Sequence, residues 1–508
     1  MTSQPAAGGR AGPPPGEGAA AGAGMAAGAG TAAAAGRGAE GTAADADRGA
    51  GGGTGADADR GADEGTAADA DGGAGGGRGA DAGRAADALA AACADLRPAG
   101  PADAVAGVLP SWVAAPASVA EAAATMRVAA GLDLAVVPRG SGSRLSWGLP
   151  PRSCDLVIET GRLDRVLEHA AGDWIASVQA GVSLDQLADV LGEAGQQLSL
   201  DVPAPAGAGG GTVGGVLATG MAGPRRMRYG TPRDLLTGIT VIRADGRVAR
   251  AGGKVVKNVA GYDLGKLYAG SFGTLGLIAE ATFRLHPVPA ASGYVTLECG
   301  TAAEAAAAVA AAVESPLAAA AVEIDRLAPG APVRVAVLVE GSPAGVPQRV
   351  TGMRELLGDD AVVADDVPGW WGHGAAAASD STLIRIAFWS SALRAVLDVL
   401  DSAALAAALE PSVGGSPGAG VLYAAVDSLA EPAAVAAFVA ALRAEIGRVR
   451  AAGFPPARGS VVVLNAPPLV RGAVDMWGPV PGAALMRAVK DQFDPGHRMA
   501  PGRFAGGI

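Results

Sequence analysis

The stretch Pro138-Arg139-Gly140-Ser141-Gly142-Ser143-Arg144 decides the fold, and it follows directly after the apolar run Leu134-Ala135-Val136-Val137. Consecutive small residues let main-chain N–H groups converge on an anion without obstruction by Cβ atoms, and the two serine hydroxyls can add donors. A buried strand that ends in such a loop predicts an anion-binding turn. A plain turn between two strands explains the loop equally well when it is taken alone.

A dinucleotide-binding fingerprint is the alternative for this loop. Glu159 ends the next predicted strand nineteen residues after Gly140, where such a fingerprint places a ribose-binding acid. In that fold, however, the phosphate loop opens a helix. The segment Leu145-Ser146-Trp147-Gly148-Leu149-Pro150-Pro151 is unsuited to a helix because of its glycine and its two prolines. We therefore expect the loop itself to hold any anion.

Two further glycine-rich segments follow. Pro203 to Gly220 consists mostly of glycine, alanine and proline and leads into the basic cluster Arg225-Arg226-Met227-Arg228. Its backbone is expected to approach a large ligand closely, and the arginines suit a charged or phosphorylated one; a flexible linker is the alternative. The next segment, Lys257-Asn258-Val259-Ala260-Gly261-Tyr262-Asp263-Leu264, precedes Gly270-Ser271-Phe272-Gly273-Thr274-Leu275-Gly276, whose glycines suggest backbone donors to another part of the same ligand.

Short helices and strands alternate irregularly along the chain, which indicates an α+β fold without the rhythm of a barrel. Ser118 and Glu121 form a capping-box pattern at the start of one helix. The elements predicted before residue 290 are helices at Ala85–Leu96, Ser118–Ala130 and Leu184–Leu191 and strands at Leu134–Val137, Leu156–Glu159, Trp174–Gln179 and Leu277–Leu285. After Pro287 and Pro289 a second block predicts a small antiparallel sheet with helices on one face. Its elements are strands at Tyr294–Glu298, Val333–Leu338 and Leu383–Phe388 and helices at Ala302–Val313, Pro432–Ala451 and Val480–Phe493.

Composition narrows the class of protein. Of the 79 glycines in 508 residues, 26 lie in residues 1–84, which contain no Leu, Ile, Val, Phe, Trp or Tyr; this segment is predicted to be a disordered tail. The net charge of −11 and the lack of a basic stripe argue against nucleic-acid binding. Cys93, Cys154 and Cys299 are too far apart for a disulfide framework, a zinc site or an iron–sulfur cluster. With no signal peptide or integral membrane segment in the sequence, we expect a cytoplasmic protein, held at the inner face of the cell membrane only through partners.

The glycine segments and the carboxyl end, Trp477-Gly478-Pro479 and Phe493-Asp494-Pro495-Gly496 through Pro501-Gly502-Arg503-Phe504, resemble one known family. The chain is similar to the FAD-linked oxidases of the vanillyl-alcohol oxidase type and, within them, to the FAD-binding subunit of bacterial glycolate oxidase. The resemblance implies a two-subdomain PCMH-type FAD-binding domain over 105–290. It also implies a smaller α+β substrate or cap domain over 291–508 that ends in a closing helix.

The resemblance also implies which residues bind FAD. The first loop would hold the pyrophosphate, the second would line the ribityl and isoalloxazine side, and the third would meet the adenine end. These residues are Pro138, Arg139, Gly140, Ser141, Gly142 and Ser143, then Gly211, Thr212, Val213, Gly214, Gly215, Ala218 and Gly220, then Gly276, Leu277 and Ile278. Some members attach FAD to a histidine in the first loop. This chain has Ser143-Arg144 there, so we expect non-covalent FAD.

The sequence defines the catalytic residues less clearly than the FAD-binding residues. Oxidation of a 2-hydroxy acid requires a cation for the carboxylate and a base for the hydroxyl proton. Lys257, Tyr262 and Arg385 are the candidates, with Arg225, Arg226 and Arg228 as further anion holders. A solvated sheet edge is the alternative for Arg385. His373 is isolated in Trp370-Trp371-Gly372-His373-Gly374, and no metal site is expected.

The predicted function is that of the FAD-binding subunit of a glycolate oxidase or dehydrogenase complex that oxidises glycolate to glyoxylate. The resemblance implies a second FAD-binding subunit and an iron–sulfur subunit as partners. One alternative is a non-catalytic flavin-bearing assembly or electron-transfer subunit. Another is a stand-alone FAD oxidase of a different 2-hydroxy acid such as D-lactate.

Overall fold

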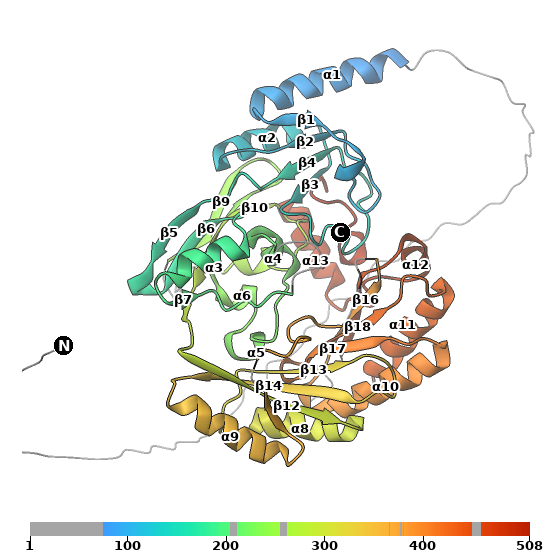
Figure 1. Cartoon of the computed structure of the whole chain (residues 1–508). Coiled ribbons are helices and arrows are strands. Elements are labelled where there is room, and N and C mark those ends of the chain that lie inside the picture. Colours follow the sequence, from blue (N-terminus) through green and yellow to red (C-terminus); the bar gives the residue numbers. More distant parts are fainter. Residues whose placement is uncertain are drawn as a thin grey trace, which may run out of the picture. The chain divides into compact units, whose positions relative to one another are not determined.

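The computed structural model describes residues 75–203, 211–254, 262–364, 366–375, 378, 380–449 and 459–508, with side chains from residue 83 onward. Three sheets of four, five and eight strands organise this part of the chain (Figure 1). Most of the tail predicted over 1–84 lies outside the described residues. Its last part forms the first turns of helix α1, Gly75–Ala92. The helix predicted over Ala85–Leu96 thus begins and ends earlier, and Leu96–Pro98 is a strand.

The four-stranded sheet has the order β1-β2-β4-β3, with parallel pairing from β2 to β3 and an antiparallel edge at β1. Helix α2 covers it. The Ser118 hydroxyl caps α2 by accepting from Glu121 N, but the Glu121 carboxylate accepts from Ala94 N and Ala117 N rather than closing a capping box. The elements are β1 Leu96–Pro98, η1 Pro101–Asp103, β2 Trp112–Ala114, α2 Val119–Gly131, β3 Val136–Arg139 and β4 Leu156–Glu159.

The five-stranded sheet, order β5-β6-β10-β8-β9, is antiparallel throughout. Leu187, Leu217, Ile239 and Phe283 belong to the buried core between this sheet and its helices. The elements are β5 Val166–Ala170, η2 Ala171–Asp173, β6 Ile175–Gln179, α3 Leu184–Gly192, β7 Gln196–Gln197, α4 Val213–Thr219, α5 Arg226–Tyr229, α6 Pro232–Leu235, β8 Leu236–Ile242, β9 Val248–Gly252, α7 Gly265–Tyr268, β10 Leu277–Arg284 and β11 His286–Pro287.

The eight-stranded cap sheet is built from two successive βαββαβ units, joined where β13 pairs with β17. Alternate valines of β14, such as Val335 and Val337, face the core formed with the helices. Arg334 and Glu340 lie on the opposite face, which carries charged side chains besides the apolar Ala336 and Leu338 and is called the polar face below. The elements are β12 Ala291–Cys299, α8 Ala302–Glu314, β13 Ala321–Arg326, β14 Val333–Gly341, α9 Gly345–Leu357, β15 Val362–Ala364, β16 Thr382–Ala387, η3 Ser390–Ala392, α10 Leu393–Ala407, β17 Ser412–Ser416, η4 Pro417–Ala419, β18 Val421–Val426, α11 Pro432–Ile446 and β19 Ser460–Asn465.

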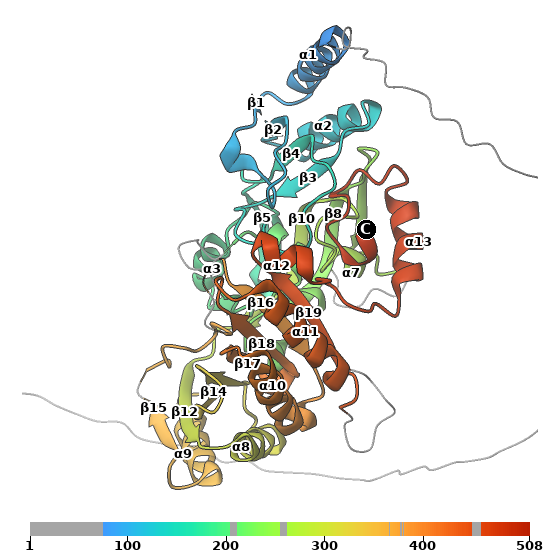
Figure 2. The ribbon, with the colours of Figure 1, turned by 90° about the vertical axis from the view of Figure 1, so that its right-hand side faces the viewer.

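The carboxyl end leaves the cap and returns to the first domain (Figure 2). Phe493 of α13 packs edge-on against Tyr268 of α7, and Val136 of β3 exchanges backbone hydrogen bonds with Arg498 and Ala500. Within the segment predicted to end the second domain, 291–508, Val489 and Phe493 of α13 pack against the core of the five-stranded sheet, whereas Met486 and Ala505 pack against the cap core. The elements are α12 Pro468–Ala473, α13 Ala483–Phe493 and η5 Ala505–Gly507.

No helix in the described part of the chain is long and apolar enough to cross a membrane.

Candidate functional site

A cavity that is open to solvent lies where the predicted glycine loops meet. Its walls come from the first loop, from α4, from the end of the third loop and from the carboxyl terminus. The lining residues are Pro138, Arg139, Gly140, Ser141, Gly142, Ser143, Arg144, Leu145, Thr160, Thr212, Gly214, Gly215, Ala218, Thr219, Phe272, Gly273, Gly276, Leu277, Ile278 and Arg503.

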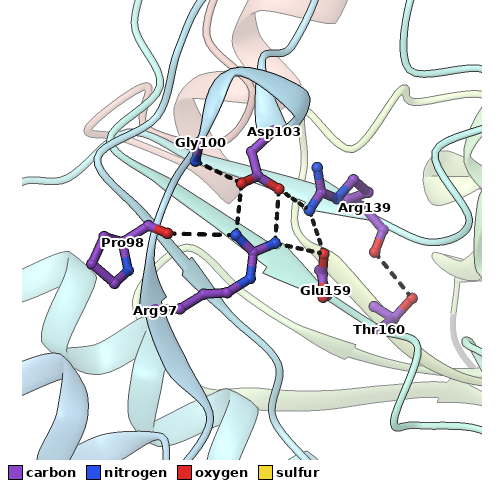
Figure 3. Close-up of polar contacts among 7 residues, drawn as sticks. All are labelled: Arg97, Pro98, Gly100, Asp103, Arg139, Glu159 and Thr160. Carbon is purple, nitrogen blue, oxygen red and sulfur yellow. Dashed lines mark hydrogen bonds and ion pairs between the residues drawn. The ribbon is translucent and has the colours of Figure 1, made fainter.

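The first loop connects β3 to a series of turns and not to a helix, which excludes the dinucleotide-binding alternative for it. Gly142 has a φ of +77°, a conformation that favours glycine. A network of ion pairs, shown in Figure 3, stabilises the loop through Arg139. Arg139 pairs with Glu159 and, at 2.8 Å, with Asp103, while its carbonyl oxygen accepts from Thr160 N at 2.9 Å. Glu159 therefore serves the loop as an ion-pair partner and not as a ribose ligand.

Asp103 is the centre of this network. Its carboxylate is buried and accepts two hydrogen bonds from Arg97, at 2.6 and 2.8 Å, one from Gly100 N and one from Arg139. Arg97, the Gly100 amide and Arg139 hold the pKa of the Asp103 carboxyl far below its usual range. The residue precedes the glycine loop by more than thirty positions, and no local sequence pattern connects them.

The second glycine segment is only partly a loop, because helix α4 begins at Val213. A Cβ on Gly140 would lie 2.1 Å from Thr212 Oγ1, so the first loop and α4 are in close contact only because Gly140 lacks one. A Cβ on Gly214 would lie 2.8 Å from Ala180 Cβ. Gly214 thus lets α4 approach the end of β6, in addition to lining the cavity.

The third loop is fixed by the carboxyl-terminal segment. Lys490 is fully buried and donates to Thr274 O at 2.6 Å, to Met499 O at 2.9 Å and to Asp494 at 2.7 Å. Asp494 also accepts from Met499 N. This buried pair explains the Asp494-Pro495-Gly496 motif as a structural junction between the loop and the chain end. Amphipathic spacing in α13 gave no sign that its lysine would be buried.

Most of the predicted FAD-binding residues line this one cavity. The exceptions are close to it: Val213 is buried in the core, Gly220 ends α4 with a φ of +65°, and a Cβ on Gly211 would lie 3.3 Å from Arg144. Reasoning from the sequence missed the lining residues Arg144, Leu145, Thr160, Thr219, Phe272 and Arg503. Arg144 and Arg503 belong to sequence motifs described above. Nothing in the spacing of these motifs indicated that the two side chains line the cavity.

The predicted catalytic residues are not brought together. Lys257 lies outside the described residues. The Tyr262 side chain is 90% exposed and is not among the residues that line the cavity. Arg385 lies in β16, the strand next to the edge strand β19 of the cap sheet. It is half-buried there and not at a solvated sheet edge, since β18 and β19 flank it on both sides.

The polar face of the cap sheet meets α5. Arg225 pairs with Glu340 at 2.8 Å, and Tyr229 donates to the same carboxylate at 2.9 Å. These contacts dock α5 on the sheet, so Arg225 is not free to hold a ligand. Arg228 is exposed and stacks over the Tyr229 ring. Of the predicted anion holders, Arg226 and Arg385 remain.

Arg226 and Arg385 both lie near Tyr423 of β18. Arg226 donates to the Tyr423 hydroxyl at 3.2 Å, and Tyr423 is the cross-strand neighbour of Arg385. Within the described part of the chain the Arg385 side chain makes no hydrogen bond or ion pair. Burial and the charge of Arg226 lower its pKa. Arg144, from the FAD cavity, is also close enough to Tyr423 to interact with it electrostatically.

Two buried carboxyl groups complete this face. Glu323 accepts from Gly372 N at 2.7 Å and from the Ser416 hydroxyl at 3.0 Å. Burial raises its pKa to about 7, and burial likewise raises the pKa of Asp201 to about 6. His373, next to Gly372, is exposed. The described residues contain no group of three or more His, Cys, Asp or Glu side chains that could hold a metal ion.

Comparisons with known proteins agree with this geometry. Residues 110–252 match a family described as FAD binding domain. A D-lactate dehydrogenase of Archaeoglobus fulgidus is 38% identical over 175 residues, or 34% of this chain and 38% of that protein. Glycolate oxidase subunit GlcD of Bacillus subtilis is 35% identical over 182 residues (36% and 38%), and subunit GlcE of Escherichia coli is 35% identical over 157 residues (31% and 44%). The chain thus matches less than half the length of these relatives.

Solved structures extend the likeness of fold to most of the chain. p-Cresol methylhydroxylase with substrate bound superimposes with a TM-score of 0.63 at 15% identity, over 84% of this chain and 96% of that one. An alkyldihydroxyacetonephosphate synthase gives a TM-score of 0.57 at 18% identity, over 78% of both chains. At such low identity these matches show the fold alone.

The charges of the residues that line the cavity suit an anionic cofactor such as FAD. Three arginines and no carboxylate line the cavity, and the Nε atoms of Arg144 and Arg503 are buried without a hydrogen-bond partner, as expected for a site that receives an anion. Fold and cavity together define an FAD-binding protein with a cap domain. Over residues 110–252 the chain matches the FAD binding domain family, and over about a third of its length it is similar to FAD-linked oxidases and dehydrogenases.

Proposed function

We propose that this chain is an FAD-dependent oxidoreductase that oxidises the CH–OH group of a small 2-hydroxy acid, with glycolate converted to glyoxylate. The observation that carries the proposal is the unpaired Arg385 on the polar face of the cap sheet, beside Tyr423 and Arg226. The names of the relatives, which include D-lactate dehydrogenase and glycolate oxidase subunits, support the class of substrate.

The charges on this face support an anionic substrate. An arginine that is half-buried without an acidic partner is costly unless an anion joins it. A carboxylate matches the planar fork of a guanidinium. Arg385 would hold the substrate carboxylate, and the Tyr423 hydroxyl, fixed by Arg226, would orient it. FAD, when bound, accepts the hydride that leaves the Cα atom of the substrate.

Replacement of Arg385 tests the proposal. Because a charge-assisted hydrogen bond contributes about 1.5–3 kcal/mol, Arg385→Leu should raise the glycolate concentration for half-maximal flavin reduction by about 10- to 100-fold. The flavin content should stay unchanged. Arg228→Leu, an exposed arginine of the same region, is the matched control and should change the value less than about twofold. An unchanged glycolate dependence in Arg385→Leu would rule out this substrate site.

The partners are part of the proposal. Cys93, Cys154 and Cys299 are buried, separate and free, so an iron–sulfur centre that accepts the electrons would lie on another chain. We propose a complex with a second FAD-binding subunit and an iron–sulfur subunit, in the cytoplasm or at the inner face of the membrane through these partners. FAD would be bound non-covalently.

A second function remains, that of an assembly or electron-transfer subunit which carries flavin but oxidises no substrate. The observation that favours it is the similarity to both GlcD and GlcE, which are named as separate subunits of a glycolate oxidase. D-Lactate and 2-hydroxyglutarate should be compared with glycolate as reductants of the bound flavin. Reduction by D-lactate alone would favour a stand-alone oxidase of that acid.

A further inference from the structure

The three arginines that line the FAD cavity differ in their partners. Arg139 is neutralised, because its guanidinium pairs with both Asp103 and Glu159. Arg144 and Arg503 have no acidic partner, and no aspartate or glutamate lines the cavity. The wall of the cavity therefore carries two positive charges that no described side chain balances.

Arg144 directly follows the first glycine loop. It is 8% exposed and donates to Pro203 O and, at 3.5 Å, to the Ser143 hydroxyl. Its Nε has no hydrogen-bond partner. Burial lowers its pKa, but a guanidinium stays charged at neutral pH.

Arg503 reaches the same cavity from the carboxyl terminus. It is 4% exposed and donates to Leu145 O and Trp147 O, both at 2.7 Å, while its Nε is unpartnered. Burial lowers its pKa to about 10, so it too is charged at neutral pH. The two carbonyl groups hold the guanidinium against the backbone that follows the first loop.

We propose that Arg144 and Arg503 are the counter-ions of the FAD diphosphate. Buried charges without partners destabilise a protein, and an anion that enters the cavity removes this cost. The two uncompensated charges match the diphosphate of FAD, with one negative charge on each phosphate. The glycine loops supply neutral N–H donors and the arginines supply the charge. Arg503 lies outside the matched domain 110–252, so the FAD site is complete only when the carboxyl terminus has folded onto it.

This inference rests on FAD binding and not on the identity of the substrate. If the chain fails to oxidise glycolate, the counter-ions are unaffected. Their test is a binding measurement, in which apoprotein is titrated with FAD and with riboflavin, which has the same ring system but no phosphate. Quenching of flavin fluorescence gives both dissociation constants.

Arg144→Met and Arg503→Met should each raise the dissociation constant for FAD at least about tenfold, as expected for the loss of a charge-assisted contact. The constant for riboflavin should change less than about twofold, because it presents no charge to these side chains. Arg487→Met is the matched control. Arg487 also donates to a backbone carbonyl of the carboxyl-terminal segment, Gly506 O, but it is exposed and outside the cavity, so both constants should stay unchanged.

Equal losses of FAD and riboflavin affinity would overturn the proposal, because the arginines would then only shape the cavity or contact the ring system. Unchanged FAD affinity would overturn it as well. Arg144→Lys and Arg503→Lys keep the charge with little loss of volume, and each should retain most of the FAD affinity. If a methionine variant does not fold, the lysine variants decide. A lysine variant that folds and binds riboflavin but has lost FAD affinity about tenfold would refute charge as the cause.

Discussion

Asp103 shows how a single buried carboxylate can control the first flavin loop. It connects the segment before the FAD-binding domain to Arg139, whose carbonyl oxygen holds Thr160 in the cavity wall. Removal of its charge leaves Arg139 with Glu159 alone. Because the pKa of Asp103 is far below its ordinary value, its contribution to the free energy of unfolding is complete at neutral pH and is lost only in strong acid.

Asp103→Asn should lower the free energy of unfolding by about 3 kcal/mol at neutral pH, the typical cost of breaking a buried ion pair. Arg162→Gln is the control, because Arg162 and its partner Asp95 are 49% and 51% exposed and lie outside the network; it should cost less than about 1 kcal/mol. Denaturant unfolding at pH 7 measures both values. A loss in Asp103→Asn no greater than that in Arg162→Gln would mean that the network does not support the loop.

Residues whose role depends on backbone shape were predictable, and residues whose role depends on distant partners were not. Gly140 and Gly142 are in a loop whose composition already indicates close approach of a ligand. Asp103 and Lys490 act through partners far away in the sequence, and Arg503 reaches the cavity because the chain end folds back. Such long-range contacts leave no local pattern.

Glu323 connects three elements of the cap, namely β13, β17 and the turn at Gly372. Burial raises its pKa from an ordinary 4.5 to about 7. The folded protein therefore binds a proton between these values that the unfolded chain has released. The free energy of unfolding should fall as the pH rises from about 4.5 to about 7, and should level off above that.

Glu323→Gln should flatten this decline, because a glutamine does not titrate while its amide can still accept from Gly372 N. The expected difference between the two ends of the pH range is on the order of 3 kcal/mol, from about 1.4 kcal/mol for each unit of pKa. Glu355→Gln, an exposed residue of α9, should leave the decline intact. Denaturant unfolding across the range measures it, and an equally steep decline in Glu323→Gln would assign it to other groups.

At the scale of elements, most of the helices and strands that hydrophobic spacing predicted agree with the structure to within a few residues, but several others, such as β8, α10 and β18, were not predicted. α8, predicted over Ala302–Val313, is Ala302–Glu314, and β10, predicted over Leu277–Leu285, is Leu277–Arg284. Helix α4 in the second glycine-rich segment was not predicted, because its many glycines are more typical of a loop than of a helix. Its cap, Thr212, which accepts from Gly215 N, was the signal that could have revealed the helix.

For the whole molecule, the two βαββαβ units of the cap present one polar face, and the carboxyl terminus completes the cavity in the other domain. The sequence predicted the α+β class and, through its motifs, the FAD-binding domain. Helices on one face of an antiparallel sheet were also predicted, but the eight-strand order and the return of the chain end depend on pairings between distant segments. In the proposed function, Arg385 on the polar face of the cap would hold the carboxylate of the substrate.

A single measurement shows whether this chain itself oxidises a 2-hydroxy acid. The purified chain, loaded with FAD and without any partner, is mixed anaerobically with glycolate while the flavin absorbance is recorded. We expect the flavin to be bleached, because in the proposed function the substrate and cofactor sites both belong to this chain. A flavin spectrum that stays unchanged with glycolate, D-lactate and 2-hydroxyglutarate would contradict it and leave the chain as a flavin-bearing subunit whose partner performs the oxidation.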